Sequence, residues 1–168
     1  MHLSRSPSAL SADAEPAFGA CRCSRAPRPR TLHTVMRDEY GMNVFVVEDA
    51  PEVRKRLVAM LGTVAGVDVV GEADSVRGAI DGALAAATDV LLLDLQLTDG
   101  NGLDVLAAVK PARPGLRTIV MSNFANPQYR QASLAAGADV FLDKSQEFAR
   151  VPGILRGWLG STPAPLVS

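Results

Sequence analysis

The sequence predicts an α/β domain with a five-stranded, doubly wound parallel sheet. Short apolar runs without polar alternation, such as Val90-Leu91-Leu92-Leu93, are typical of strands that helices cover on both faces. Five such runs alternate along the chain with segments whose apolar residues recur at helical spacing. Strict alternation of strand and helix favours right-handed crossovers, and therefore a parallel sheet with helices on both sides.

Length and composition indicate one domain between two terminal segments. The chain has 168 residues, 48% of them hydrophobic, which is enough for a proper core. We expect a disordered Pro/Arg/Ser-rich tail over residues 1–41, the domain over 42–160 and a flexible end over 161–168. The formal net charge of -1 argues against direct DNA binding. No membrane span or secretion leader is recognisable, so we expect no membrane contact and a cytoplasmic location.

The first two strand–helix units are predicted between the tail and the middle of the chain. An apolar run over residues 44–47 predicts the first strand, which ends in Glu48-Asp49. Pro51 follows where a first-turn proline is tolerated, and a helical stripe continues from it. The second strand is predicted over 67–70, and Ser75 suits the N-cap of the next helix.

The third and fourth units follow the same pattern. The third strand is predicted over residues 90–94, and a turn at 99–102 leads into a helix. We expect that helix to stop near Pro111 and Pro114-Gly115, because helices tend to end at proline. The fourth strand is predicted over 118–122, and its helix should begin after Asn126-Pro127.

The fifth unit completes the predicted sheet. Gly137 is a natural stop for the preceding helix, and the fifth strand is predicted over residues 139–144. A last helix holds apolar residues between Phe148 and Leu159. Pro152-Gly153 within it predicts a kink or a late start.

Polar residues stand at the ends of four predicted strands. They are Glu48 and Asp49 after the first, Asp94 at the third, Ser122 at the fourth and Lys144 at the fifth. The carboxyl ends of parallel strands lie along one edge, so these residues should meet in one crevice. Clustered carboxylates repel one another unless a cation intervenes, and an oxygen-lined site suits Mg²⁺. Lys144 would supply a point charge for an anion, and Ser122 a hydroxyl donor.

Such a set indicates phosphoryl transfer to a carboxylate. A magnesium ion and a lysine neutralise the charge that develops on the phosphoryl oxygens. Asp94 would be the nucleophile. Each residue alone is a weak signal, whereas the ordered set, at the ends of separate strands, is a strong one.

On these residues the sequence resembles the receiver domain of two-component response regulators, a CheY-like family with a flavodoxin-like (βα)5 fold. The resemblance covers nearly all of residues 43–159, and it depends on Glu48, Asp49, Asp94, Gly102, Ser122, Phe141 and Lys144. It implies that Asp94 accepts a phosphoryl group from a sensor histidine kinase or a histidine phosphotransferase. The implied Mg²⁺ ligands are Glu48, Asp49, Asp94 and the backbone carbonyl of Gln96.

The resemblance also implies a switch. Ser122 would swing toward the phosphoryl group while Phe141 turns inward, which would alter a surface for a downstream protein. Both residues have ordinary interpretations too, as a strand-end hydroxyl and a core aromatic. The sequence departs from the family at Thr98, where a proline is common, so we expect a less fixed loop there. Asn123 stands where a small residue is usual, and Phe124 follows it. Both would crowd water near the acyl phosphate, so we expect slower self-dephosphorylation than in receivers with a polar residue in place of Phe124.

These inferences lead to a stand-alone receiver that catalyses only its own phosphorylation and dephosphorylation. The chain stops after the last helix, so we expect output through protein contacts, with a partner or with a second copy, and no DNA-binding domain. Two alternatives remain. One is a Mg²⁺-dependent phosphohydrolase that uses an aspartyl-phosphate, although Gln96 stands where such enzymes usually carry a second Asp. The other is an interaction module that is not phosphorylated.

Overall fold

The computed structural model describes residues 41–160. The predictions for the tail and for the C-terminal end concern residues outside this range, Gly41 excepted. Five strands form one parallel sheet in the order β2-β1-β3-β6-β7. They are β1 (Met42–Val47), β2 (Val67–Ala73), β3 (Val90–Asp94), β6 (Arg117–Ser122) and β7 (Val140–Asp143).

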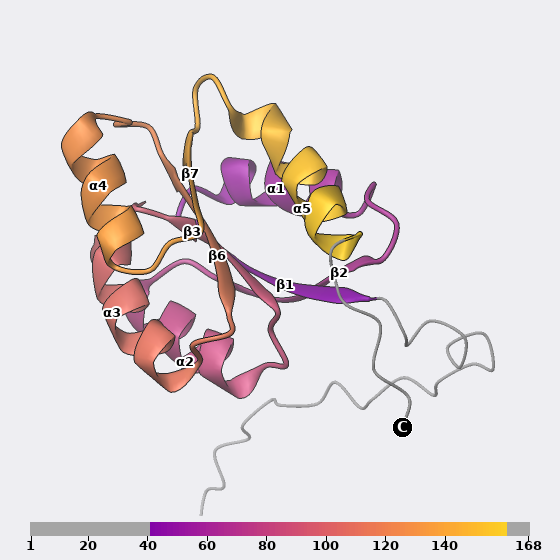
Figure 1. The fold of residues 1–168 in the computed structure, drawn as a ribbon, viewed down its shortest axis with the longest axis horizontal. Helices are drawn as coiled ribbons and strands as arrows, with labels where there is room; N and C mark the ends of the chain where they lie inside the picture. Colours follow the sequence, from indigo (N-terminus) through magenta and orange to yellow (C-terminus); the bar gives the residue numbers. More distant parts are fainter. Residues whose placement is uncertain (1–40, 161–168) are drawn as a thin grey trace, which may run out of the picture. The chain divides into compact units, whose positions relative to one another are not determined.

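Five α-helices cover the two faces of this sheet. They are α1 (Pro51–Leu61), α2 (Val76–Ala85), α3 (Gly102–Ala112), α4 (Pro127–Ala135) and α5 (Val151–Leu159). Helices α1 and α5 pack on one face, while α2, α3 and α4 pack on the other (Figure 1). The doubly wound α/β prediction is therefore confirmed. Within residues 41–160, no helix has the length and apolar character needed to cross a membrane.

Local signals in the sequence account for several helix ends. The Ser75 hydroxyl caps α2 by accepting a hydrogen bond from Gly78 N, as predicted. Asn126 caps α4 in the same way, with Pro127 in its first turn. A 3₁₀ turn over Phe148–Arg150 precedes α5, whose first turn holds the proline that predicted a late start.

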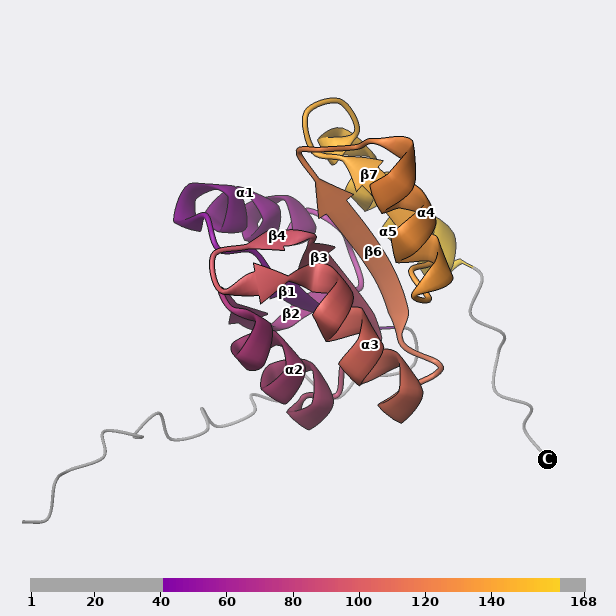
Figure 2. The same ribbon diagram turned by 90° about the vertical axis from the view of Figure 1, so that its left-hand side faces the viewer.

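The structure also contains a short hairpin that the sequence analysis did not predict. Strands β4 (Gln96–Leu97) and β5 (Gly100–Asn101) pair in antiparallel fashion directly after β3. The hairpin lies between the end of β3 and the start of α2 (Figure 2). A turn was expected only over residues 99–102, and the structure shows a paired hairpin over residues 96–101 instead.

The β1–β2–α2 corner is organised around Phe45, a buried residue of β1. Its ring fills the space left by two residues without side chains, Gly71 on β2 and Gly82 on α2. A Cβ atom at either glycine would clash with the ring. Three elements that are distant in sequence are thus packed together at one aromatic side chain.

Gly102 is the first residue of α3, and it lies against the backbone at the end of β3. A Cβ at Gly102 would lie 2.5 Å from the carbonyl oxygen of Asp94 and 3.0 Å from Cα of Leu95. Both are backbone atoms, so α3 would have to shift away from the sheet. We expect Gly102→Ala to lower the free energy of unfolding by about 1–3 kcal/mol, measured by urea denaturation.

Gly153→Ala provides a matched control for this prediction. Gly153 lies in α5, and a Cβ there meets nothing within 4 Å. Alanine has a higher helix propensity than glycine, so this control should gain up to about 1 kcal/mol. A Gly102→Ala variant as stable as the wild type would show that α3 can move away from Asp94 without cost.

Candidate functional site

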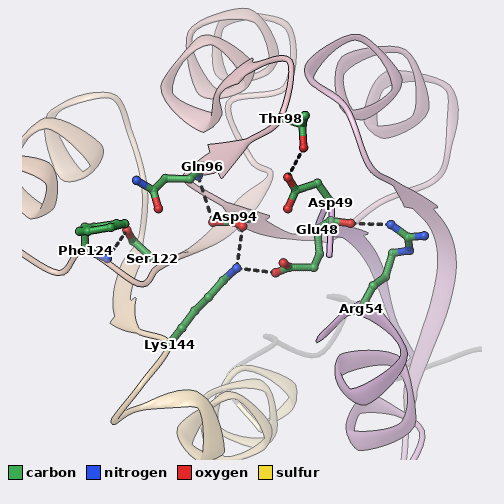
Figure 3. Close-up of polar contacts among 9 residues, drawn as sticks. All are labelled: Glu48, Asp49, Arg54, Asp94, Gln96, Thr98, Ser122, Phe124 and Lys144. Atoms are coloured by element: carbon green, nitrogen blue, oxygen red, sulfur yellow. Dashed lines mark hydrogen bonds and ion pairs between the residues drawn. The ribbon is translucent and has the colours of Figure 1, made fainter. Parts of the chain in front are cut away.

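The carboxyl edge of the sheet brings the predicted polar residues together. Asp94 is the last residue of the central strand, β3. Glu48 and Asp49 follow directly after the neighbouring strand β1, and Lys144 follows β7. All four side chains converge on one point of this edge (Figure 3).

Three carboxylates form a compact cluster at this point. One oxygen from each of Glu48, Asp49 and Asp94 lies within 4.8 Å of the others. Glu48 and Asp94 are buried, at 1% and 3% exposure, and Asp49 is partly exposed. Oxygen donors in this number, with an opening toward solvent at Asp49, suit a hard divalent cation such as Mg²⁺. The donor set therefore fits the predicted cofactor.

Lys144 neutralises part of this charge. Its Nζ donates hydrogen bonds to Glu48 Oε2 and to Asp94 Oδ2, each at 2.6 Å. The lysine side chain is itself only 6% exposed. One ammonium group faces three carboxylates, so two negative charges remain unbalanced, which a divalent cation would neutralise.

Glu48 has a perturbed proton affinity. Burial raises the pKa of Glu48 above its ordinary value of 4.5. The hydrogen bond and the charge of Lys144 lower this pKa, and the nearby charge of Asp94 raises it again. Burial is the largest of these effects, because the charged carboxylate loses its hydration inside the protein.

This raised pKa predicts how Mg²⁺ affinity depends on pH. A protonated Glu48 offers no charged oxygen, so a proton and a cation compete for it. We expect the affinity to fall as the pH drops from neutral, before the ordinary pKa of glutamate is reached. Calorimetric titrations with MgCl₂ at neutral and mildly acidic pH measure this effect.

Glu48→Gln is the control, since it should weaken binding and remove this part of the pH dependence. An affinity that stays constant down to the ordinary glutamate pKa would contradict the prediction. The sign for folding without metal is the opposite of the sign for Mg²⁺ affinity. The folded state holds the Glu48 proton more tightly than the unfolded state, so without metal this group costs stability as pH rises through the raised pKa.

Both carboxylate oxygens of Asp94 accept hydrogen bonds. Its Oδ1 accepts a hydrogen bond from the backbone N–H of Gln96 at 3.0 Å, while Oδ2 accepts from Lys144. These two donors fix the plane of the carboxylate. The structure thus places Gln96 next to Asp94 through its backbone N–H. The ligand role of its carbonyl stays a prediction.

Ser122 and Phe141 occupy ordinary buried positions in this structure. The Ser122 hydroxyl accepts a hydrogen bond from Phe124 N at 3.0 Å, on the side of Asp94 away from Asp49 (Figure 3). Phe141 already lies in the core, at 3% exposure, with the Arg130 guanidinium 5.0 Å from its ring centre. Their roles in a switch stay predictions.

Sequence reasoning missed two residues that contact the cluster. Arg54 Nη1 donates to the Glu48 carbonyl oxygen at 2.6 Å, and its Nε pairs with Glu72 at 3.3 Å. The Thr98 hydroxyl donates to Asp49 Oδ2 at 2.5 Å. Arg54 lies one turn into α1, where a basic residue can reach back to the end of β1. Thr98 carries no local signal for this contact, and the expectation of a less fixed loop around it stays a prediction.

Comparison with known proteins points to one family. Residues 44–156 match the family described as response regulator receiver domain. The DNA-binding transcriptional activator DevR/DosR of Mycobacterium tuberculosis is 36% identical over 103 residues, which are 61% of this chain and 48% of that protein. Response regulator protein VraR of Staphylococcus saprophyticus is 26% identical over 115 residues, 68% of this chain and 55% of that protein. The chain therefore spans about half the length of these curated relatives.

Solved structures show the same fold. The signal receiver domain of the putative response regulator NarL from Mycobacterium tuberculosis matches with a TM-score of 0.66 and 29% identity, over 73% of this chain and 98% of that one. The isolated receiver domain of RcsB from Salmonella enterica serovar Typhimurium, studied with the phosphomimetic BeF₃⁻, matches with a TM-score of 0.67 and 25% identity, over 73% and 91%.

The relatives correct the predicted set of partners. The exclusion of direct DNA binding is wrong, because DevR/DosR is a DNA-binding transcriptional activator. That exclusion depended on net charge and on where the chain stops. The chain covers 48% of DevR/DosR, so its end carries no information about the output, and the prediction of a stand-alone receiver loses its basis.

The geometry and the comparisons agree on the nature of the domain. A family match over residues 44–156 accompanies a five-stranded parallel sheet of receiver type. The acidic cluster and Lys144 lie at the edge of that sheet where the sequence analysis expected them. The chain belongs to the response regulator receiver domain family of two-component signalling.

Proposed function

We propose that the protein is a phosphorylation-dependent receiver in which Asp94 accepts a phosphoryl group from a histidine kinase or a histidine phosphotransferase. One observation carries the proposal. The Asp94 carboxylate is buried between Lys144 Nζ and Gln96 N, beside two further carboxylates that fit Mg²⁺. Kinases that draw on ATP act in the cytoplasm, so the proposed function supports a cytoplasmic location for the protein.

The residues have distinct tasks in this reaction. An Asp94 oxygen forms the new bond to phosphorus as the bond from phosphorus to the histidine nitrogen breaks, and the electron pair of that bond stays on the imidazole. Lys144 already donates to Asp94 Oδ2, so its ammonium group is placed to stabilise charge on a phosphoryl oxygen. Glu48 and Asp49 would hold the Mg²⁺ ion, which supplies further neutralisation of that charge when bound.

We propose that the protein turns over no external substrate. A phosphohydrolase of the haloacid dehalogenase type usually carries a second Asp two residues after its nucleophile, and here that position holds Gln96. Its backbone N–H contacts Asp94, and an amide side chain cannot act as a general acid.

The likeness to DevR/DosR supports an output in transcription rather than one through protein contacts alone.

A phosphodonor and a phosphate mimic test this function without knowledge of the kinase. Purified protein is incubated with acetyl phosphate and MgCl₂, and intact mass is measured. BeF₃⁻ binding is followed by ¹⁹F NMR with and without Mg²⁺. We expect one added phosphoryl group per chain, and BeF₃⁻ binding that requires Mg²⁺. A module that is not phosphorylated would show neither, and a phosphohydrolase would release phosphate continuously from aryl phosphates.

Phe124 gives a prediction about phosphate lifetime. Its side chain is 60% exposed, and its backbone N–H donates to the Ser122 hydroxyl at the carboxyl edge of the sheet. We expect Phe124→Glu to lose its phosphoryl group faster, because a carboxylate orders attacking water where the ring excludes it. The rate is measured by intact mass after removal of the phosphodonor.

Leu134→Glu is the matched control for the Phe124 variant. Leu134 lies on α4 and is also an exposed large apolar residue, at 46% exposure. Its substitution should leave the phosphate lifetime unchanged. Loss from Phe124→Glu that is no faster than from the wild type would contradict the prediction.

A further inference from the structure

The β4–β5 hairpin connects the acidic cluster to a helix outside the site. Its first residue, Gln96, contacts Asp94, and its last residue, Asn101, caps α3 by accepting from Leu103 N at 2.9 Å. The two residues at its tip, Thr98 and Asp99, make contacts in opposite directions. A hairpin with only two residues per strand has little stability of its own, so these side-chain contacts hold it in place.

The first tip contact is the hydrogen bond from Thr98 to Asp49. The Thr98 hydroxyl donates to Oδ2 of Asp49, which leaves the second carboxylate oxygen free for a cation. Asp49 is the least buried member of the acidic cluster, so its side chain is the one with most freedom to rotate. A donor on one oxygen restricts that rotation. Hydrogen bonds of this kind orient metal-binding carboxylates in proteins.

The second tip contact anchors the hairpin on α2. Both oxygens of Asp99 accept from the backbone N–H of Val76, at 2.9 and 3.0 Å. Val76 is the first residue of α2, and its N–H has no partner within the helix. A carboxylate at a helix N-terminus is further stabilised by the helix dipole. Asp99 therefore ties the position of Thr98 to the start of α2.

We propose that Thr98 is a positioning residue for the cation ligand Asp49, and that Asp99 holds Thr98 in place by fastening the hairpin to α2. This inference rests on the proposed function, because it assigns to Asp49 the role of a Mg²⁺ ligand. The proline that is common at this position in the family has no hydroxyl group. A chain with proline at this position cannot make the contact with Asp49. Here the side chains of Thr98 and Asp99 hold the hairpin in place through hydrogen bonds.

Mg²⁺ affinity of single variants tests the first part. Calorimetric titration with MgCl₂ is done on the full chain for the wild type, Thr98→Val and Thr98→Ser. Valine keeps the shape of threonine without the donor, and we expect a loss of affinity of about tenfold. Serine retains the hydroxyl, so it should restore affinity close to the wild type.

Thr63→Val is the matched control. Thr63 is another exposed threonine whose hydroxyl donates at 2.7 Å, to the Met60 carbonyl at the end of α1. Removal of that donor should leave Mg²⁺ affinity unchanged. Thermal unfolding of each variant without Mg²⁺ separates a local effect on Asp49 from a general loss of structure.

A double-mutant cycle tests the second part. Asp99→Ala should weaken Mg²⁺ binding when residue 98 is threonine, and should add no further loss in the Thr98→Val background. Additive losses would show that Asp99 acts on the site by another route. They would overturn its role in holding Thr98.

The outcomes separate this inference from the proposed function. If the wild-type chain binds no Mg²⁺, the proposed function is overturned. The positioning of Asp49 as a Mg²⁺ ligand is then overturned with it. A wild-type chain that binds Mg²⁺, with a Thr98→Val variant that binds equally well, would overturn the positioning role alone. Failure of Thr98→Ser to restore affinity would also overturn it, because the donor would then not be the cause.

Discussion

Asp94→Asn is expected to abolish incorporation of a phosphoryl group from acetyl phosphate. An amide oxygen is a far weaker nucleophile than a carboxylate oxygen, because the asparagine side chain carries no negative charge with which to attack phosphorus. Asparagine keeps the size of the side chain and an oxygen that can accept from Lys144. The fold should therefore persist while the chemistry is lost, and intact mass measures the result.

Asp143→Asn is the control for this experiment. Asp143 ends β7 at the same edge of the sheet, where it accepts hydrogen bonds from Ser145 and takes no part in the acidic cluster. Its variant should be labelled like the wild type. Labelling that survives Asp94→Asn would show that another residue is the acceptor, with Asp49 as the first candidate to test.

Lys144→Met is expected to cause the largest loss of stability. In the absence of Mg²⁺ the variant leaves Glu48 and Asp94 close together and buried, without their shared cation. Removal of one partner from a buried ion pair costs about 3–5 kcal/mol, because the remaining charge stays desolvated. Urea denaturation at neutral pH, with and without MgCl₂, measures this cost. Mg²⁺ should recover part of it by neutralising the same carboxylates.

The control is a lysine whose ion pair lies in solvent. Lys55 contacts Glu52 at 3.0 Å, and its side chain is 73% exposed. Solvent screens that pair, so Lys55→Met should change stability by less than about 1 kcal/mol. If the two lysine variants lost the same free energy of unfolding, burial would not be the reason that the Lys144 contacts stabilise the protein.

The sequence predicted the frame of the domain because its signals are local. The unbroken apolar run before Asp94 indicated a buried central strand, and Ser75 marked the start of α2. The polar residues at strand ends predicted the acidic cluster and Lys144, since parallel strands share an edge. Lys144 lies directly after β7 rather than within it, a difference of one residue.

What the sequence did not predict depends on contacts between distant segments. The β4–β5 hairpin has strands of two residues, too short for any alternation of polar and apolar side chains. Thr98 is 49 residues from Asp49, so no spacing rule connects the two. Gly102 was one of the residues on which the resemblance depended, and the structure gives a physical reason for a glycine there, which is the close approach of α3 to the Asp94 carbonyl.

The packing of Phe45 constrains how this domain can change in evolution. Because its ring fills the space at both Gly71 and Gly82, a side chain can appear at either position only if residue 45 becomes smaller. We expect the three positions to covary among receivers that share this corner. Phe45 lies on β1, and Glu48 directly follows the end of that strand, three residues after Phe45. Substitutions in this trio that are not compensated should therefore shift the acidic cluster as well as the core.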